Sequence, residues 1–68
     1  MELDLHGVRH HDVDRLVENF IYLNQQHVPL RIICGNSHRM ILLVKEVTDR
    51  IGCEIYEPWF GIINVNKV

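Results

Sequence analysis

The chain has 68 residues, of which 47% are hydrophobic and 24% are charged, and its formal net charge is −2. This length allows one domain with a small core, and the apolar fraction is too high for a disordered segment. The apolar run at residues 40–44 is far shorter than the ~20 residues of a membrane span. The first residues lack a basic region followed by an apolar stretch, and two cysteines are too few for a disulfide scaffold. We therefore expect a reduced, cytoplasmic protein with no membrane partner.

The first half of the chain predicts a strand, a helix and a second strand. Residues 2–5, Glu-Leu-Asp-Leu, alternate polar and apolar side chains as a half-buried strand does. Apolar residues at helical spacing predict a helix over about 11–26, and Pro29 ends the loop that follows it. Residues 30–34, Leu-Arg-Ile-Ile-Cys, predict a second strand that runs directly into Gly35.

The second half begins with another helix, predicted over about 38–50. Asn36 and Ser37 are both good N-cap residues for it, and Gly52 is a natural C-terminal stop. The apolar positions of this helix are well spaced for one buried stripe: Ile41, Val44, Val47 and Ile51, widened by Met40 and Leu43.

A terminal hairpin completes the predicted order, β-α-β-α-β-β. Residues 53–57 alternate as a third strand, Pro-Trp-Phe-Gly at 58–61 predicts a turn, and 62–65 predict a fourth strand. Strands joined through a helix are parallel with a right-handed crossover, so both helices are expected on one face of the sheet. The predicted fold is an α/β two-layer sandwich with a four-stranded mixed sheet, and residues 1–68 form its single domain.

Two loops are expected to meet at one edge of this sheet. The first two strands are predicted to be parallel, so their carboxyl ends share an edge and residues 4–7 lie close to 34–38. Ligands of open α/β sheets bind outside such carboxyl ends, and the start of a helix attracts anions. No acidic residue occurs in 6–11 or in 31–45, whereas both segments contain basic residues. The sequence therefore predicts a basic face on a weakly acidic protein.

Leu3-Asp4-Leu5-His6-Gly7 resembles the motif that opens Smr (small MutS-related) domains, and the order of elements matches that family along essentially the whole chain. The Smr fold is similar to the C-terminal domain of bacterial translation initiation factor three. Smr domains bind nucleic acid and several cleave DNA or RNA, so the resemblance implies a nucleic-acid partner and endonuclease activity. The family's second motif is Thr-Gly-x-Gly or His-Gly-x-Gly, and here Cys34-Gly35-Asn36-Ser37 keeps only its first glycine.

The resemblance implies catalytic roles for Asp4 and His6, which match the family's essential pair. Alternation along the strand would aim both side chains at the same side of the sheet edge. Histidine exchanges protons near neutral pH, so His6 would deprotonate a 2′-hydroxyl or protonate a leaving oxygen. Asp4 would orient the ring or hold a cation such as Mg²⁺ or Mn²⁺, and the need for a metal stays open. The implied nucleic-acid contacts are Gly7, Arg9, Gly35, Asn36, Ser37, His38 and Arg39.

Structural roles compete with chemical ones at several of these positions. Asp4 also suits the cap of a turn. His10 and His11 favour a solvated helix entry, because adjacent side chains diverge and zinc needs three or four converging ligands. Cys34 is more typical of a packed residue than of a nucleophile, and it is expected at the opposite edge from Cys53, too far for a disulfide.

Three functions follow from these features. The first is an Smr-like endonuclease acting on DNA or RNA, between which the sequence does not choose. The second is a binding module of the same fold that does not cleave, which the altered second loop favours. The third is a protein–protein adaptor. Three aromatic residues are candidates for the uncovered sheet face: Tyr56, Trp59 and Phe60. The same residues are candidates for a self-association surface that would make a homodimer.

Overall fold

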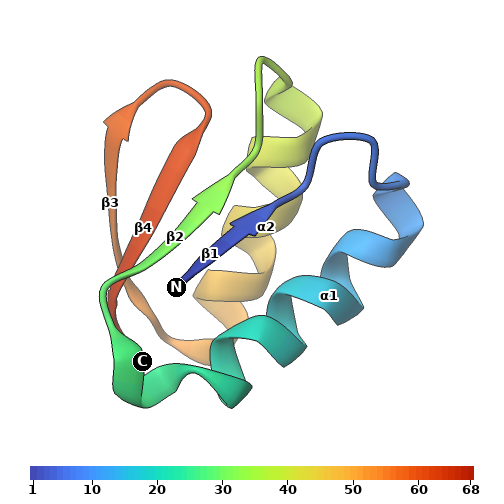
Figure 1. Cartoon of the computed structure of the whole chain (residues 1–68). Helices are drawn as coiled ribbons and strands as arrows, with labels where there is room; N and C mark the ends of the chain where they lie inside the picture. Colours follow the sequence, from blue (N-terminus) through green and yellow to red (C-terminus); the bar gives the residue numbers. More distant parts are fainter.

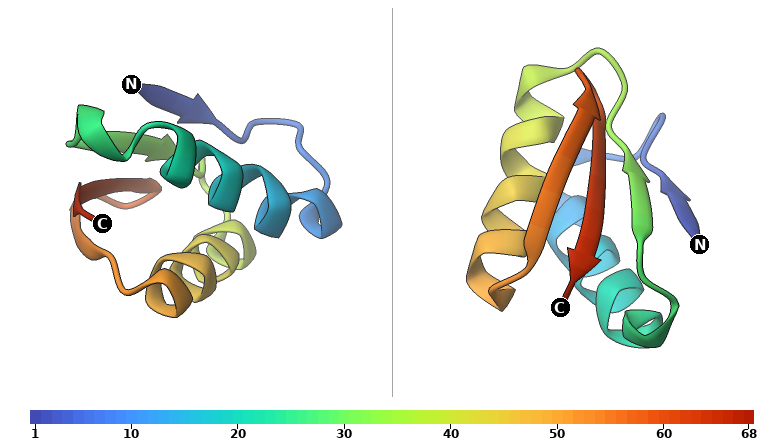
Figure 2. Two further views of the ribbon diagram at one scale, coloured as in Figure 1. Left: turned by 90° about the horizontal axis from the view of Figure 1, so that it is seen from below. Right: turned by 90° about the vertical axis from the view of Figure 1, so that its left-hand side faces the viewer.

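The computed structural model describes residues 1–68 and has the predicted order of elements (Figure 1). The strands are β1 (Glu2–Asp4), β2 (Leu30–Ile33), β3 (Glu54–Trp59) and β4 (Ile62–Lys67), and the helices are α1 (His10–Leu23), α2 (His38–Ile51) and the short 3₁₀ helix η1 (Gln25–His27). Both long helices pack on one face of the sheet, as Figure 2 shows from two directions. The protein is therefore a two-layer α/β sandwich, as predicted.

The sheet has the strand order β1-β2-β4-β3. β1 is parallel to β2, whereas β4 lies between β2 and β3 and is antiparallel to both. The parallel pairing brings the carboxyl ends of β1 and β2 to the same edge, the upper one in Figure 1. Both α1 and α2 start from this edge, because each follows one of these two strands.

The core lies between the sheet and the two helices. Thirteen buried apolar residues form one cluster, to which both long helices, strands β2 and β4 and the residues that follow β1 and β2 contribute: Leu5, Val13, Val17, Ile21, Leu30, Ile32, Cys34, Met40, Ile41, Val44, Val47, Ile63 and Val65. Neither helix is long and apolar enough to cross a membrane.

Helix α1 ends earlier than predicted. The side-chain amide of Asn24 donates a hydrogen bond to the Phe20 carbonyl (2.8 Å), and the Asn24 N–H bonds Ile21 O. These bonds satisfy carbonyls of the last turn, and the chain continues as the separate turn of η1. Leu23, the last residue of α1, is 81% exposed.

Helix α2 has the predicted caps. Of the two N-cap candidates, Ser37 is the residue that caps the helix. Its hydroxyl accepts a hydrogen bond from the Met40 N–H (3.2 Å). Gly52 ends the helix in the left-handed conformation (φ 89°), which favours glycine because it lacks a Cβ. The two long helices are joined at their surface by Arg50, which donates to both carboxylate oxygens of Asp14 (2.9 Å each) and to Glu18 (2.7 Å).

The terminal hairpin differs from the prediction at its turn. β3 continues through Pro58 and Trp59, so only Phe60 and Gly61 form the turn. A proline is tolerated here because β3 is an edge strand and its register with β4 shifts between Tyr56 and Trp59.

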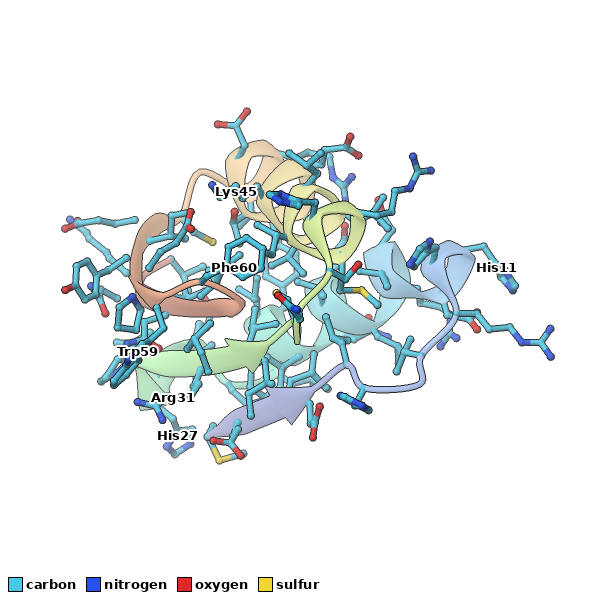
Figure 3. The ribbon with its side chains drawn as sticks, turned by 90° about the horizontal axis from the view of Figure 1, so that it is seen from above. His11, His27, Arg31, Lys45, Trp59 and Phe60 are labelled. Atoms are coloured by element: carbon cyan, nitrogen blue, oxygen red, sulfur yellow. The ribbon has the colours of Figure 1, made fainter.

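The face of the sheet away from the helices is open. Strand registers place Trp59 beside Ile62 and Tyr56 beside Asn64 on this face, and Arg31 follows on β2. Figure 3 shows Trp59 and Arg31 on this side, whereas Phe60 lies at the edge between the hairpin and α2. Trp59 (66% exposed) and Tyr56 (59%) thus occupy the open face as expected, and Phe60 does not.

Candidate nucleic-acid interface

The two loops predicted to meet do so at the edge where β1 and β2 end. They border an open surface hollow of about 290 Å³ between the β1–α1 loop and the start of α2. Its lining contains His6, Gly7, Gly35, Asn36 and Ser37 from the predicted set, together with Leu5, Val8, His10, Cys34 and Met40. The prediction that residues 4–7 lie close to 34–38 is confirmed for those residues of the two segments that line this hollow.

The His6 imidazole lies against the second loop. A methyl group built at Gly35, which has a positive φ of 71°, would be 3.7 Å from His6 Nδ1. His6 is exposed and forms part of the wall of the hollow, so its ring is accessible to a ligand there. At this distance the methyl group would make only ordinary contact with the ring, so the ring lies close to Gly35, and the positive φ rather than lack of space is what favours glycine there.

Asp4 reaches His6 through the backbone. β1 ends at Asp4, so strand alternation does not extend to His6, which lies in the turn that follows. The Asp4 carboxylate accepts a hydrogen bond from the backbone N–H of His6 (2.9 Å), and Asp4 does not line the hollow. Asp4 therefore caps the turn that follows β1, which is the structural alternative given above, and it makes no hydrogen bond to the His6 ring.

A second, shallower hollow of about 730 Å³ continues from the first one. It lies between the starts of α1 and α2, shares Gly7, Val8 and His10 with the first hollow, and is also lined by Arg9, His11, Arg39 and Leu43. No acidic residue lines it. Two predicted contacts, Arg9 and Arg39, therefore reach one basic groove from two different helices.

The backbone adds positive potential to this edge. The first N–H groups of a helix have no partner within the helix, and they form the positive end of its dipole. α1 and α2 both present this end here, and Arg9 at the N-cap of α1 makes no side-chain capping bond. α2 has no acidic residue in its first turn, while α1 has Asp12, which pairs with Arg15 (3.4 Å).

His38 lies on the other side of the Gly35 loop and lines neither hollow. Its ring meets Phe60 edge to face, with the two centroids 4.9 Å apart and the planes at 68°. The neighbouring Gly61 is buried, and its carbonyl accepts a hydrogen bond from the Cys34 N–H (2.7 Å). A methyl group on Gly61 would overlap the Gly35 carbonyl oxygen. The hairpin turn therefore braces the loop, a contact that the sequence analysis missed.

Cys34 is a packed core residue. Its side chain is buried, and this burial, with a smaller contribution from the Glu57 charge, raises the pKa of its thiol to about 11. Burial also raises the pKa of Cys53, and both cysteines are free thiols. A thiol with so high a pKa stays protonated at neutral pH, so the nucleophile alternative has no support from its surroundings.

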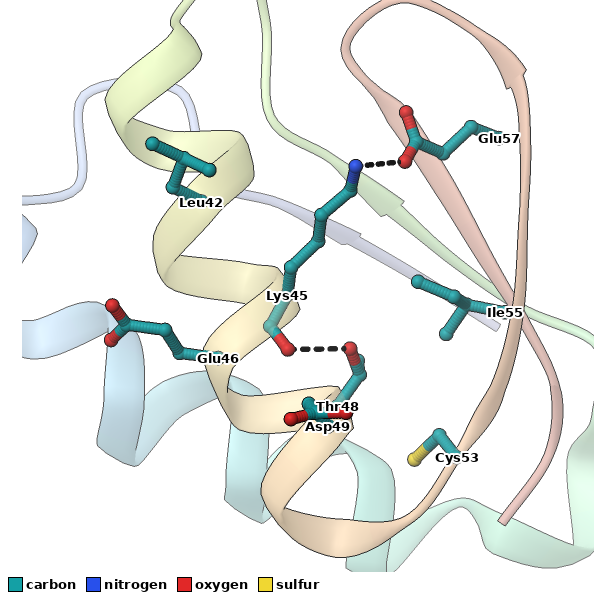
Figure 4. Close-up of a pocket in the computed structure, with 8 residues that line it drawn as sticks. All are labelled: Leu42, Lys45, Glu46, Thr48, Asp49, Cys53, Ile55 and Glu57. Atoms are coloured by element: carbon teal, nitrogen blue, oxygen red, sulfur yellow. Dashed lines mark hydrogen bonds and ion pairs between the residues drawn. The ribbon is translucent and has the colours of Figure 1, made fainter.

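A separate groove of about 510 Å³ runs between α2 and β3, away from this edge (Figure 4). The ammonium group of Lys45 points across it to the Glu57 carboxylate, with which it forms an ion pair. Arg31, from the same acid-free stretch, projects from the open sheet face instead. Of the four basic residues in 31–45, two therefore lie at the edge where the two loops meet: His38 and Arg39.

The side chains present do not make a resident cation site. No group of three or more His, Cys, Asp or Glu residues comes together anywhere in the chain. Asp4 already uses one carboxylate oxygen for the His6 N–H, and His10 and His11 lie in the basic groove. The side chains therefore build no all-protein cage for Mg²⁺ or Mn²⁺, and Asp4 is the one carboxylate of the predicted site that could share such an ion with a substrate phosphate.

No family model, no curated protein and no solved structure matches this chain.

Proposed function

We propose that the chain is an Smr-like nucleic-acid-binding domain that cleaves phosphodiester bonds of DNA or RNA at the two-loop edge. The observation that carries the proposal is the continuity of the two hollows. The first holds the His6 imidazole against the Gly35 loop, and the second presents Arg9 and Arg39 with no acidic neighbour in its lining.

Binding would follow from charge and backbone geometry. A sugar-phosphate strand along the groove would contact two arginines and two helix starts, each of which favours an anion. Residues Gly35, Asn36 and Ser37 would give the phosphate in the first hollow backbone and side-chain donors. Ser37 Oγ accepts the Met40 N–H, which leaves its own hydroxyl proton for an acceptor.

Cleavage would use His6 as a proton carrier. On RNA its neutral ring would take the proton of a 2′-hydroxyl, whose oxygen attacks phosphorus while the bond to the 5′-oxygen breaks. A second donor must return a proton to that leaving oxygen. His10 lines the same hollow and is a second imidazole suited to this role. Asp4 would hold the His6 backbone and so limit the positions of the ring.

Binding without cleavage is the second candidate. Ser37 stands where the Smr motif has its second glycine, and its side chain caps α2 and lines the first hollow. A side chain at this position restricts how closely a phosphate approaches the backbone.

One assay separates the two candidates. Labelled single-stranded, double-stranded and branched DNA and RNA are incubated with wild type, His6→Ala and His27→Ala. His27 is a matched control because it is an exposed imidazole on η1, beyond the far end of α1. Wild type and His27→Ala should cleave, whereas His6→Ala should be at least about 100-fold slower. Parallel reactions with EDTA and with Mg²⁺ or Mn²⁺ show whether cleavage needs a cation.

The other outcomes are equally informative. Cleavage that is unchanged in His6→Ala would remove that residue from the chemistry. Binding by all three proteins with no product selects the non-cleaving module. Binding that is equally tight at 50 and 200 mM salt would contradict every nucleic-acid function, because phosphate contacts weaken with salt.

A further inference from the structure

We propose that Phe60 stacks on an unpaired nucleobase of the strand whose phosphate occupies the Gly35 loop. The ligand is thereby a single-stranded or locally unpaired DNA or RNA segment. The inference rests on the proposed nucleic-acid function and adds to it a contact to the base, at a residue outside both hollows.

Phe60 is held at a fixed place relative to the loop. It occupies the first position of a two-residue turn, followed by the buried Gly61. The Cys34 N–H donates to the Gly61 carbonyl, and Gly61 packs so closely on Gly35 that no side chain fits between them. An aromatic ring on this turn is therefore anchored beside the predicted phosphate site.

The ring is available to a ligand and has little role in the core. Phe60 is 54% exposed and does not belong to the apolar residues that form the core or pack against it. Its described aromatic contact is the edge-to-face one with His38, at the start of α2. In a T-shaped pair one ring presents its edge and the other a single face, so at least one face of the Phe60 ring is left uncovered by His38.

The neighbouring Trp59 provides an internal comparison. It is more exposed than Phe60, at 66%, yet its strand register places it on the open sheet face with Ile62. Figure 3 shows the two labelled aromatic side chains on different sides of the hairpin. Exposure alone would therefore favour Trp59, whereas proximity to the Gly35 loop favours Phe60.

The chemistry of the ligand follows from what a phenyl ring recognises. Every nucleobase has a π face, so stacking on an aromatic side chain tolerates any sequence. Bases inside a duplex already stack on their neighbours, and only an unpaired base can cover the ring. The site would accordingly prefer single strands, frayed ends or junctions to continuous duplexes.

The test compares two single-stranded oligonucleotides of equal length, one with ordinary nucleotides and one abasic. Both carry the same number of phosphates, so they differ only in the bases. Affinities are measured for wild type, Phe60→Leu and the matched control Trp59→Leu. Loss of one stacked base should weaken binding about 5- to 150-fold. We expect this loss for Phe60→Leu with the ordinary strand and for wild type with the abasic strand. Phe60→Leu should not weaken binding to the abasic strand further, and Trp59→Leu should bind like wild type.

The salt dependence provides a second readout. Phe60→Leu should lower affinity at every salt concentration without changing the slope of log K against log salt, because it removes no phosphate contact. A merely structural role in bracing the loop would instead weaken both oligonucleotides equally. That result would overturn the stacking inference.

A fluorescent variant covers the case in which Phe60→Leu does not fold. In Trp59→Phe/Phe60→Trp the single tryptophan sits at the proposed stacking position, and its emission should be quenched by the ordinary strand and less by the abasic one. If the ordinary strand binds without quenching the tryptophan emission, the stacking inference is rejected but the proposal of nucleic-acid binding is not. If wild type binds neither strand at 50 mM salt, the proposed function itself fails.

Discussion

The contact between the hairpin turn and the Gly35 loop can be tested by comparing two glycines with the same backbone conformation. Gly61 has φ +90° and Gly52 has φ +89°, so an added Cβ is disfavoured by the backbone at both. Their surroundings differ: a Cβ at Gly52 meets nothing within 4 Å, whereas one at Gly61 would overlap the Gly35 carbonyl oxygen. The pair Gly61→Ala and Gly52→Ala therefore isolates this contact.

The two variants should differ clearly in stability. At Gly52 the left-handed conformation costs about 1 to 2 kcal/mol, partly offset by the smaller entropy of the unfolded alanine chain, for a net loss of about 1 kcal/mol. Gly61→Ala must also move the turn away from Gly35, which breaks the hydrogen bond from the Cys34 N–H to Gly61. An unpaired buried N–H adds about 1 to 3 kcal/mol.

Urea unfolding at a low temperature, followed by circular dichroism, measures both losses. A chain of this size has a stability of about 3 to 10 kcal/mol, so Gly61→Ala should remain measurably folded under these conditions. In a separate thermal scan, the midpoint temperature of Gly61→Ala should lie about 10 °C below that of Gly52→Ala. Equal losses for the two variants would refute the reasoning, because they would mean that the turn does not bear on the loop.

Two further predictions concern titratable groups. Hydrogen bonds from Arg50 hold the pKa of Asp14 below its ordinary value of 3.8. This pair therefore stabilises the fold above about pH 4, and its stabilising effect is lost as the pH falls through the lower pKa that Asp14 has in the folded state. Arg50→Met should flatten the fall in melting temperature between pH 4 and 2 relative to wild type, and parallel curves would contradict this. Burial raises the pKa of the Cys34 thiol to about 11 and also raises that of Cys53, but only Cys34 is a buried core residue. Cys34 should therefore be alkylated at pH 8 more slowly than half-buried Cys53, as read by mass spectrometry of peptides. Equal rates would show that Cys34 is not buried in solution.

Most of the fold could be predicted because its signals are local. Helical spacing, β-branched runs and the glycine at position 52 identify all the main elements within a few residues of their true ends. The clearest error was the turn at 58–61, where Pro58 was taken as a break. An edge strand with an irregular register accepts proline, and that position in the sheet is not visible in a local pattern.

The site was partly predictable for a topological reason. Parallel strands joined through a helix bring their carboxyl ends together, which was sufficient to place His6 beside Gly35. The brace from Gly61 was not predictable, because it depends on β4 lying next to β2. His10 lies exposed at the first residue of α1, as the prediction of a solvated helix entry has it, and it also lines both hollows, which the sequence did not predict. Its position as the first residue of the helix after the His6 loop was the available signal.

The same topology explains how a chain of net charge −2 can present a basic edge. Several basic side chains are neutralised where they lie: Arg50 by two carboxylates between the helices, and Lys45 by Glu57 across the α2–β3 groove. Arg9 and Arg39 form no ion pair, and both stand where a helix begins. Internal pairing thus removes basic charge from the rest of the helix layer and leaves it at the edge that the parallel strands create. The proposed nucleic-acid partner therefore rests on the unpaired charges at this shared edge and not on the net charge of the chain.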